Sequence, residues 1–271
     1  EELGKSGSTV NKYIGLVSRA INLGRREYEL PITYNPCSLV ERCSETRHIM
    51  RTCSEEEWSN LLELATKVTT KKQYYYGNKD YKYKIAVLDL GCKKSILKNF
   101  NKRQALCKIF PAKTNFREMD KWKPNGFFIS NGPGDPASMD YAVKTVKDIL
   151  KNNIPIFGIC LGHQVLCLAL GAKTKKMFQG HRGGNHPVKN LETNKVEITC
   201  QNHGFEVLSN SLPSNVIQTH ISLFDKTNEG IEHSELPIFS VQYHPEAAPG
   251  PHDAQYLFNR FVTLMQAQGR A

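Results

Sequence analysis

The chain lacks the sequence features of several large protein classes. Its 271 residues contain no C-x-x-C pair, and its eight cysteines do not follow the spacing of a zinc site. No apolar stretch approaches the roughly 20 residues that a membrane-spanning helix needs. Residues 1–5 carry no secretory hydrophobic region, and internal repeats and low-complexity tracts are missing. These absences argue against a zinc module, a membrane protein, a secreted protein and a repeat protein.

Cysteine usage and net charge indicate the cellular setting and the kind of surface to expect. Several cysteines lie in apolar runs, which is typical of reduced core thiols, and we therefore expect a cytoplasmic protein. The formal net charge is +10, and residues 81–271 carry 24 basic against 15 acidic side chains. An excess of this size spread over a domain is usual for a solvated surface and does not by itself predict nucleic-acid binding.

The pattern of apolar residues divides the chain into parts. Residues 1–68 are predicted to form a helical segment, because apolar side chains recur at three- and four-residue spacing. Residues 69–81 are polar apart from their tyrosines, and they are predicted to be a linker. Over residues 82–271, strand and helix patterns alternate, which predicts an α/β domain with a mostly parallel sheet flanked by helices.

The most informative segment is G-I-C-L-G-H-Q at residues 158–164. It follows a predicted buried strand and precedes a predicted helix, so Cys160 would sit on a tight strand-to-helix turn. Such a turn lifts a nucleophile above the sheet edge, and Gly158 and Gly162 leave room for close backbones. The helix N-terminus would favour the thiolate. Taken alone, G-x-C-x-G fits an ordinary turn with a buried cysteine equally well.

A nucleophilic cysteine also needs a base and a group that orients the base. His244 follows an apolar strand that ends near residue 243, and Glu246 lies two residues further on, within reach of the imidazole. A triad of Cys160, His244 and Glu246 is therefore predicted. Considered in isolation, a histidine at a strand end is more often structural.

The loop S-N-G-P-G-D-P at residues 130–136 follows another predicted strand. Ligands bind at the carboxyl ends of parallel strands, so this loop is predicted to offer one backbone N–H to an oxyanion. The N–H of Leu161, next to the cysteine, would be the other donor. As a lone motif, G-P-G-D-P indicates a turn more often than a site.

Five ordered segments give the chain a resemblance to the class I, triad-type glutamine amidotransferases. Residues 130–136 and 158–164 match motifs that occur across several amidotransferases. The segments at 183–189, 201–205 and 243–253 are similar, more narrowly, to the glutaminase domain of the carbamoyl-phosphate synthase small subunit. The resemblance covers residues 82–271 and implies a flavodoxin-like glutaminase fold.

The resemblance also implies a role at each matching position. Cys160 would attack the side-chain amide of L-glutamine, release ammonia and form a glutamyl thioester, while His244 would transfer protons and Glu246 would hold His244. The glutamine pocket and oxyanion site would be formed by Gly132, Gly134, Leu161, Gln164, Asn202, Gly204 and Phe205.

The same resemblance implies the partners. No metal or organic cofactor would be needed for glutamine hydrolysis. The ammonia would pass to the ATP-binding large subunit of carbamoyl-phosphate synthase, in arginine or pyrimidine synthesis. Neither a membrane nor a nucleic acid is expected as a partner.

The first part of the chain departs from the family pattern. The family's own N-terminal domain, which lends a serine to the glutamine pocket, has no counterpart in residues 1–66. From residue 8 onward this part resembles a fragment of a tyrosine recombinase without its catalytic residues, and an unrelated helical extension fits equally well. Three alternatives stay open: a natural or artefactual fusion, a folded but non-catalytic interaction module, and DNA binding through residues 1–66.

Overall fold

The computed structural model describes residues 64–247 and 250–268, together with Ser18. The chain divides into two compact units, residues 1–53 and 54–271. The helices and strands from α3 onward all lie in the second unit. Most of the predicted helical segment at 1–68, with its recombinase resemblance, therefore lies outside the described residues.

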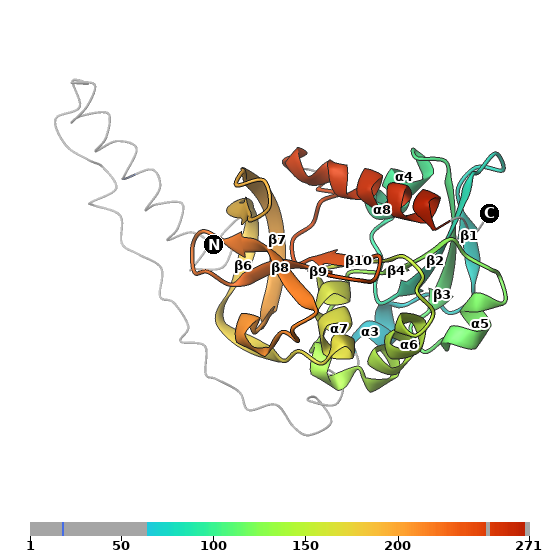
Figure 1. Cartoon of the computed structure of the whole chain (residues 1–271), viewed down its shortest axis with the longest axis horizontal. Coiled ribbons are helices and arrows are strands. Elements are labelled where there is room, and N and C mark those ends of the chain that lie inside the picture. The colour runs from blue at the N-terminus through green and yellow to red at the C-terminus, as the bar shows by residue number, and fades with distance from the viewer. Residues whose placement is uncertain (1–17, 19–63, 248–249, 269–271) are drawn as a thin grey trace, which may run out of the picture. The chain divides into compact units, whose positions relative to one another are not determined.

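A ten-stranded sheet is the framework of the second unit (Figure 1). Its strand order is β1-β3-β2-β4-β5-β10-β9-β8-β6-β7. The central strands β3, β2, β4, β5 and β10 are parallel, and the strands on both flanks pair antiparallel. The strands are β1 (Tyr74–Tyr76), β2 (Tyr83–Asp89), β3 (Ala105–Pro111), β4 (Gly126–Ile129), β5 (Ile156–Ile159), β6 (Thr174–Asn190), β7 (Val196–Val207), β8 (Val216–Ser222), β9 (Asn228–His233) and β10 (Ile238–Val241).

Helices cover both faces of the parallel strands (Figure 1). Helices α4 and α8 pack on one face, and α3, α5, α6 and α7 pack on the other. The helices are α3 (Leu64–Val68), α4 (Lys94–Asn101), α5 (Phe116–Asp120), α6 (Asp140–Leu150), α7 (Leu161–Leu170) and α8 (Tyr256–Ala267). The predicted α/β fold is confirmed, with its parallel pairing confined to the centre of the sheet. Within the described part of the chain, no helix is long and apolar enough to span a bilayer.

The core has two layers because successive strand residues point to opposite faces. In β2, Ile85 and Val87 join the cluster under α4 and α8, whereas Ala86 and Leu88 join the cluster under α6 and α7. All four side chains are fully buried. Burial on both faces explains why the central strands are continuous apolar runs rather than alternating ones.

The predicted linker at 69–81 contains a strand. Strand β1 pairs antiparallel with β3, opposite residues 107–109. Ahead of it, the Thr70 backbone N–H donates to Asp89 Oδ2 at 2.7 Å, and the Thr69 hydroxyl donates to the Asp89 carbonyl at 2.6 Å. Three consecutive tyrosines carry no alternation, so the sequence did not indicate this strand. The remaining domain boundaries stay a prediction.

Candidate active site

A pocket of about 810 Å³ opens where four parallel strands end. Its walls come from the loops after β2, β4, β5 and β10, from the β6–β7 ribbon, and from α3. A concave site at the carboxyl ends of the strands is the usual setting for ligands in α/β sheets. The predicted site residues that line the pocket are Cys160, His244, Gly132, Gly134, Leu161, Gln164, Asn202, Gly204 and Phe205.

Cys160 sits on the turn between β5 and α7, as the sequence predicted. Its backbone has φ 56° and ψ −107°, a conformation in which a non-glycine residue is strained. The residue is 4% exposed, and its Sγ lies 3.9 Å from the carbonyl oxygen of Asn202. The sulfur therefore faces the pocket directly ahead of the N-terminus of α7.

Glycines make this turn possible through close backbone contacts. A Cβ at Gly162 would lie 2.0 Å from the carbonyl oxygen of Ile129, and a Cβ at Gly158 would lie 2.8 Å from the carbonyl oxygen of Gly162. Neither distance accommodates a side chain. Helix α7 can thus begin against the end of β4 only because both positions are glycine.

His244 lines the pocket, and Glu246 lies behind it. His244 Nδ1 is 2.8 Å from Glu246 Oε1, and both residues are buried. Burial lowers the pKa of His244, but Cys160 and Glu246 outweigh it and raise the pKa to about 10. Burial raises the pKa of Glu246, whereas His244 and then Lys93 lower it to a net value below the ordinary range. The pair is therefore an imidazolium against a carboxylate.

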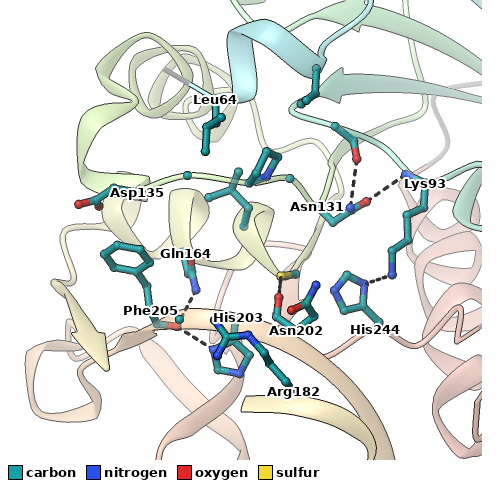
Figure 2. Close-up of a pocket in the computed structure, with 18 of the residues that line it drawn as sticks. Leu64, Lys93, Asn131, Asp135, Gln164, Arg182, Asn202, His203, Phe205 and His244 are labelled. Atoms are coloured by element: carbon teal, nitrogen blue, oxygen red, sulfur yellow. Dashed lines mark hydrogen bonds between the residues drawn. The ribbon is translucent and has the colours of Figure 1, made fainter. Parts of the chain in front are cut away.

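Lys93 is a site residue that the sequence analysis missed. Its Nζ lies 3.3 Å from His244 Nδ1 (Figure 2). The same nitrogen lies 3.3 Å from Glu246 Oε1. His244 Nδ1 donates its proton to Glu246 and has no lone pair to offer Lys93. The ammonium of Lys93 is therefore attracted to the Glu246 carboxylate and not to the imidazole. The only sequence signal was the position of Lys93 just beyond the end of β2, at the sheet edge where ligands bind.

The loop at 130–136 is tied to the loop that carries Lys93. The Leu90 backbone N–H donates to Ser130 Oγ at 2.9 Å, and the Lys93 backbone N–H donates to Asn131 Oδ1 at 3.1 Å. A Cβ at Gly132 would lie 2.0 Å from the Leu90 carbonyl oxygen. The two loops therefore pack with no side chain between them at this point.

The opposite wall is formed by β7 and the first turns of α7. Gln164 Nε2 donates to the Phe205 carbonyl at 2.8 Å, and His203 Nδ1 lies 2.8 Å from the same oxygen (Figure 2). Gln164 Nε2 also donates to Gln242 Oε1 at 2.9 Å. Two donors on one carbonyl hold this stretch of β7 against α7.

The central parallel sheet carries a cysteine on a strand-to-helix turn, at the same pocket as the histidine of a buried histidine–carboxylate pair. The family model of the class I glutamine amidotransferases matches residues 86–264, and the chain belongs to this family. The fold is also that of a solved structure from Thermoplasma acidophilum, a protein named for GMP synthase. That structure superposes with a TM-score of 0.62 at 23% identity, over 69% of this chain and 96% of the other.

The curated relatives described below are carbamoyl phosphate synthase small chains, the group within the family that the sequence predicted. The chain is 52% identical over 225 residues to the carbamoyl phosphate synthase small chain of Bartonella bacilliformis, covering 78% of this chain and 56% of the relative. It is 52% identical over 207 residues to the small chain of Chlorobaculum tepidum, covering 76% and 57%. It is 45% identical over 274 residues to the small chain of Rhizobium meliloti, a match that covers 93% of this chain and 66% of the relative. The matches thus span between about half and two thirds of the length of these relatives.

Proposed function

We propose that this chain hydrolyses L-glutamine to glutamate and ammonia through Cys160, His244 and Glu246. The observation that carries the proposal is that Cys160 and His244 line one pocket while Glu246 holds the imidazole from behind at 2.8 Å. A base with an orienting carboxylate beside a strained nucleophile is the arrangement that covalent acyl transfer needs.

In the first half-reaction the Cys160 thiolate attacks the amide carbon of glutamine. The carbon–nitrogen bond breaks, the His244 imidazolium gives its proton to the leaving nitrogen, and ammonia departs from a glutamyl thioester. The high pKa of His244 supports this assignment, because the ring carries its proton at neutral pH. A protonated imidazole also stabilises a neighbouring thiolate.

In the second half-reaction the now neutral His244 takes a proton from water. The resulting hydroxide attacks the thioester carbon, the carbon–sulfur bond breaks, and Cys160 leaves as thiolate, so the thiolate–imidazolium pair is restored. Glu246 retains its negative charge throughout and keeps the imidazole in one tautomer, a positioning role like that of the carboxylate in other triads.

The oxyanion formed in both halves would be stabilised by backbone N–H groups. We assign these to Leu161, at the N-terminus of α7, and to the loop that carries Gly132 and Gly134. Glutamine itself would be held by Gln164 and Asn202, with Gly204 and Phe205 completing the wall. These assignments rest on the lining of the pocket and on the family resemblance.

The ammonia is proposed to feed carbamoyl phosphate synthesis on the large chain of the enzyme after which the relatives are named. Since the matches cover only part of those relatives, docking to this partner is a separate part of the proposal and has its own test.

The proposed location is the cytoplasm. The five described cysteines are all free thiols, which supports a reducing setting of this kind.

The deciding experiment combines a variant with covalent labelling. Cys160→Ser should abolish glutaminase turnover, a loss of at least about a thousandfold, and should leave the circular dichroism spectrum unchanged. A chloroketone analogue of glutamine should modify the wild-type chain stoichiometrically at Cys160. The four other described cysteines, read from the same peptide map, are the internal control.

Wild-type turnover in the Cys160→Ser variant would overturn the proposal. A folded wild-type chain that neither hydrolyses glutamine nor takes up the label would instead support the non-catalytic interaction module. Ammonia transfer is tested separately, by adding the large chain of a carbamoyl-phosphate synthase and measuring glutamine-dependent formation of carbamoyl phosphate.

A further inference from the structure

A buried polar cluster lies behind the pocket wall formed by β7. It consists of His181 on β6, Gln201 and His203 on β7, and Glu229 on β9. These side chains sit in residues that are 6%, 1%, 7% and 0% exposed, respectively. Of these four residues, only His203 lines the pocket, and the other three lie behind it.

Close polar contacts join the members of the cluster. Glu229 Oε2 accepts from Gln201 Nε2 at 3.1 Å, and Glu229 Oε1 lies 3.3 Å from His181 Nδ1. Gln201 Oε1 lies 2.7 Å from His203 Nε2 and 3.0 Å from His181 Nδ1. Gln201 therefore stands between the carboxylate and the ring of His203.

The far side of the His203 ring contacts the pocket wall. His203 Nδ1 lies 2.8 Å from the Phe205 carbonyl oxygen, which also accepts from Gln164 Nε2 at 2.8 Å. Gln164 and Phe205 both line the pocket. A continuous chain of contacts thus leads from Glu229 through Gln201 and His203 to the residues proposed to hold glutamine.

The cluster is built around an ion pair. The hydrogen bond to Glu229 raises the pKa of His181, and after an opposing contribution from burial and further support from Asp225 the pKa is about 9. Burial raises the pKa of Glu229 above its ordinary value, and the hydrogen bond from His181 offsets only part of this shift. Buried charges are costly unless they are paired, so removal of His181 would leave the fully buried Glu229 without this cation. Removal of Glu229 would leave His181 with its second carboxylate, Asp225, whose Oδ2 lies 2.9 Å from His181 Nε2.

Three of these residues also have the composition of a metal site. The ligand atoms of His181, His203 and Glu229 lie within 4.8 Å of one another. However, the same nitrogen and oxygen atoms are bridged by the Gln201 amide or pair with one another directly. The contacts therefore describe a hydrogen-bonded network, and the metal alternative becomes an outcome of the test.

We propose that His181 and Glu229 are positioning residues for glutamine binding, acting through Gln201 and His203 on the Phe205 carbonyl. The inference rests on the proposed glutaminase function. Loss of either residue would remove a contact that fixes the Gln201 amide beside the His203 ring, so that the wall of the pocket shifts before substrate binds. The cost should fall on binding rather than on the chemistry at Cys160.

The test is a comparison of steady-state kinetics in the full chain. Glu229→Ala should raise the KM for glutamine about tenfold and leave kcat within about threefold, the size expected for one buried hydrogen-bonded group. Glu229→Gln keeps an oxygen that can accept from Gln201 Nε2, and its KM should be close to that of the wild type. His181→Asn should raise the KM as well, and the double variant Glu229→Ala/His181→Asn should be far from additive, because both residues act through one chain.

Glu206→Ala is the matched control, a glutamate on β7 outside the cluster, and it should keep the wild-type KM. Thermal unfolding establishes that each variant is folded, and if Glu229→Ala is not, His181→Asn carries the test. A wild-type KM in a folded Glu229→Ala or His181→Asn variant would overturn the inference, as would a stoichiometric metal ion found by elemental analysis. If the wild-type chain itself does not bind glutamine, the proposed function fails instead.

Discussion

At the scale of single residues, the site depends on backbone conformation as much as on reactive side chains. Cys160 has a positive φ of 56°, an unfavourable state for a residue with a Cβ. It is held there by the hydrogen bond from its N–H to the Val241 carbonyl at 2.9 Å and by the start of α7. The strained turn places Cys160 at the wall of the pocket.

The first prediction concerns the glycine after the nucleophile. Gly162→Ala would place a methyl group 2.0 Å from the Ile129 carbonyl oxygen, so α7 must move away from β4. We expect the free energy of unfolding to fall by about 1–3 kcal/mol or more, as for overpacked cores. Gly184→Ala is the control, because no atom lies within 4 Å of its added Cβ. Equal denaturation midpoints for the two variants would contradict this prediction.

At the scale of elements, the loop after β2 is organised by one buried carboxylate. Asp89 Oδ1 accepts from the N–H groups of Gly91 at 3.0 Å and Cys92 at 2.7 Å, and Oδ2 accepts from the Thr70 N–H at 2.7 Å. The segment that follows α3 is thereby joined to the loop that carries Lys93. Strand β2 thus determines where the ammonium of Lys93 meets the carboxylate behind the histidine.

The second prediction follows from these three bonds. Asp89→Ala would leave backbone donors without an acceptor, and the free energy of unfolding should fall by about 1–3 kcal/mol or more. Asp89→Asn keeps one oxygen acceptor, so its free energy of unfolding should fall by less than that of Asp89→Ala. Asp80→Ala, which removes an exposed carboxylate, should have no measurable effect in the same urea titration. A loss for Asp89→Ala no larger than that for Asp80→Ala would rule out this anchoring role.

At the scale of the whole molecule, buried charges link stability to pH. The pKa of His181 is about 9 in the folded chain against an ordinary value of 6.5. Between these values the folded state binds more protons than the unfolded state, so stability falls as the pH rises. His244, with a pKa of about 10, acts in the same direction.

The third prediction is a difference between pH profiles. Between pH 6.5 and pH 9, the free energy of unfolding of His181→Asn should decline less steeply than that of the wild type. The groups that face His181 are Glu229, Asp225, His186 and His203, and all remain in the variant. His252→Asn, which replaces an exposed histidine, is the control. Parallel profiles for the wild type and His181→Asn would refute the assignment of the ion pair.

Prediction from sequence succeeded where local chemistry is sufficient. The glycines around Cys160 and the strand-end position of His244 are local signals, and the structure brings both residues to one pocket. Strand β6 was not predicted, since it is long, polar and glycine-rich and pairs with β7 through register shifts. Leu64 and Val68 of α3 were not predicted as pocket residues because nothing local marks a short helix as a wall.

The amino-acid sequence by itself determined the class of the domain, because alternating apolar runs specify strands and helices and a G-x-C-x-G turn needs glycine wherever it occurs. Only the tertiary structure decided which charges meet. Lys93 and His244 are 151 residues apart, and they lie 3.3 Å apart because β10 is added to the sheet next to β5 rather than in chain order. Contacts between strand ends depend on the order of strands in the sheet, which pairwise packing sets over the whole domain and no local pattern encodes.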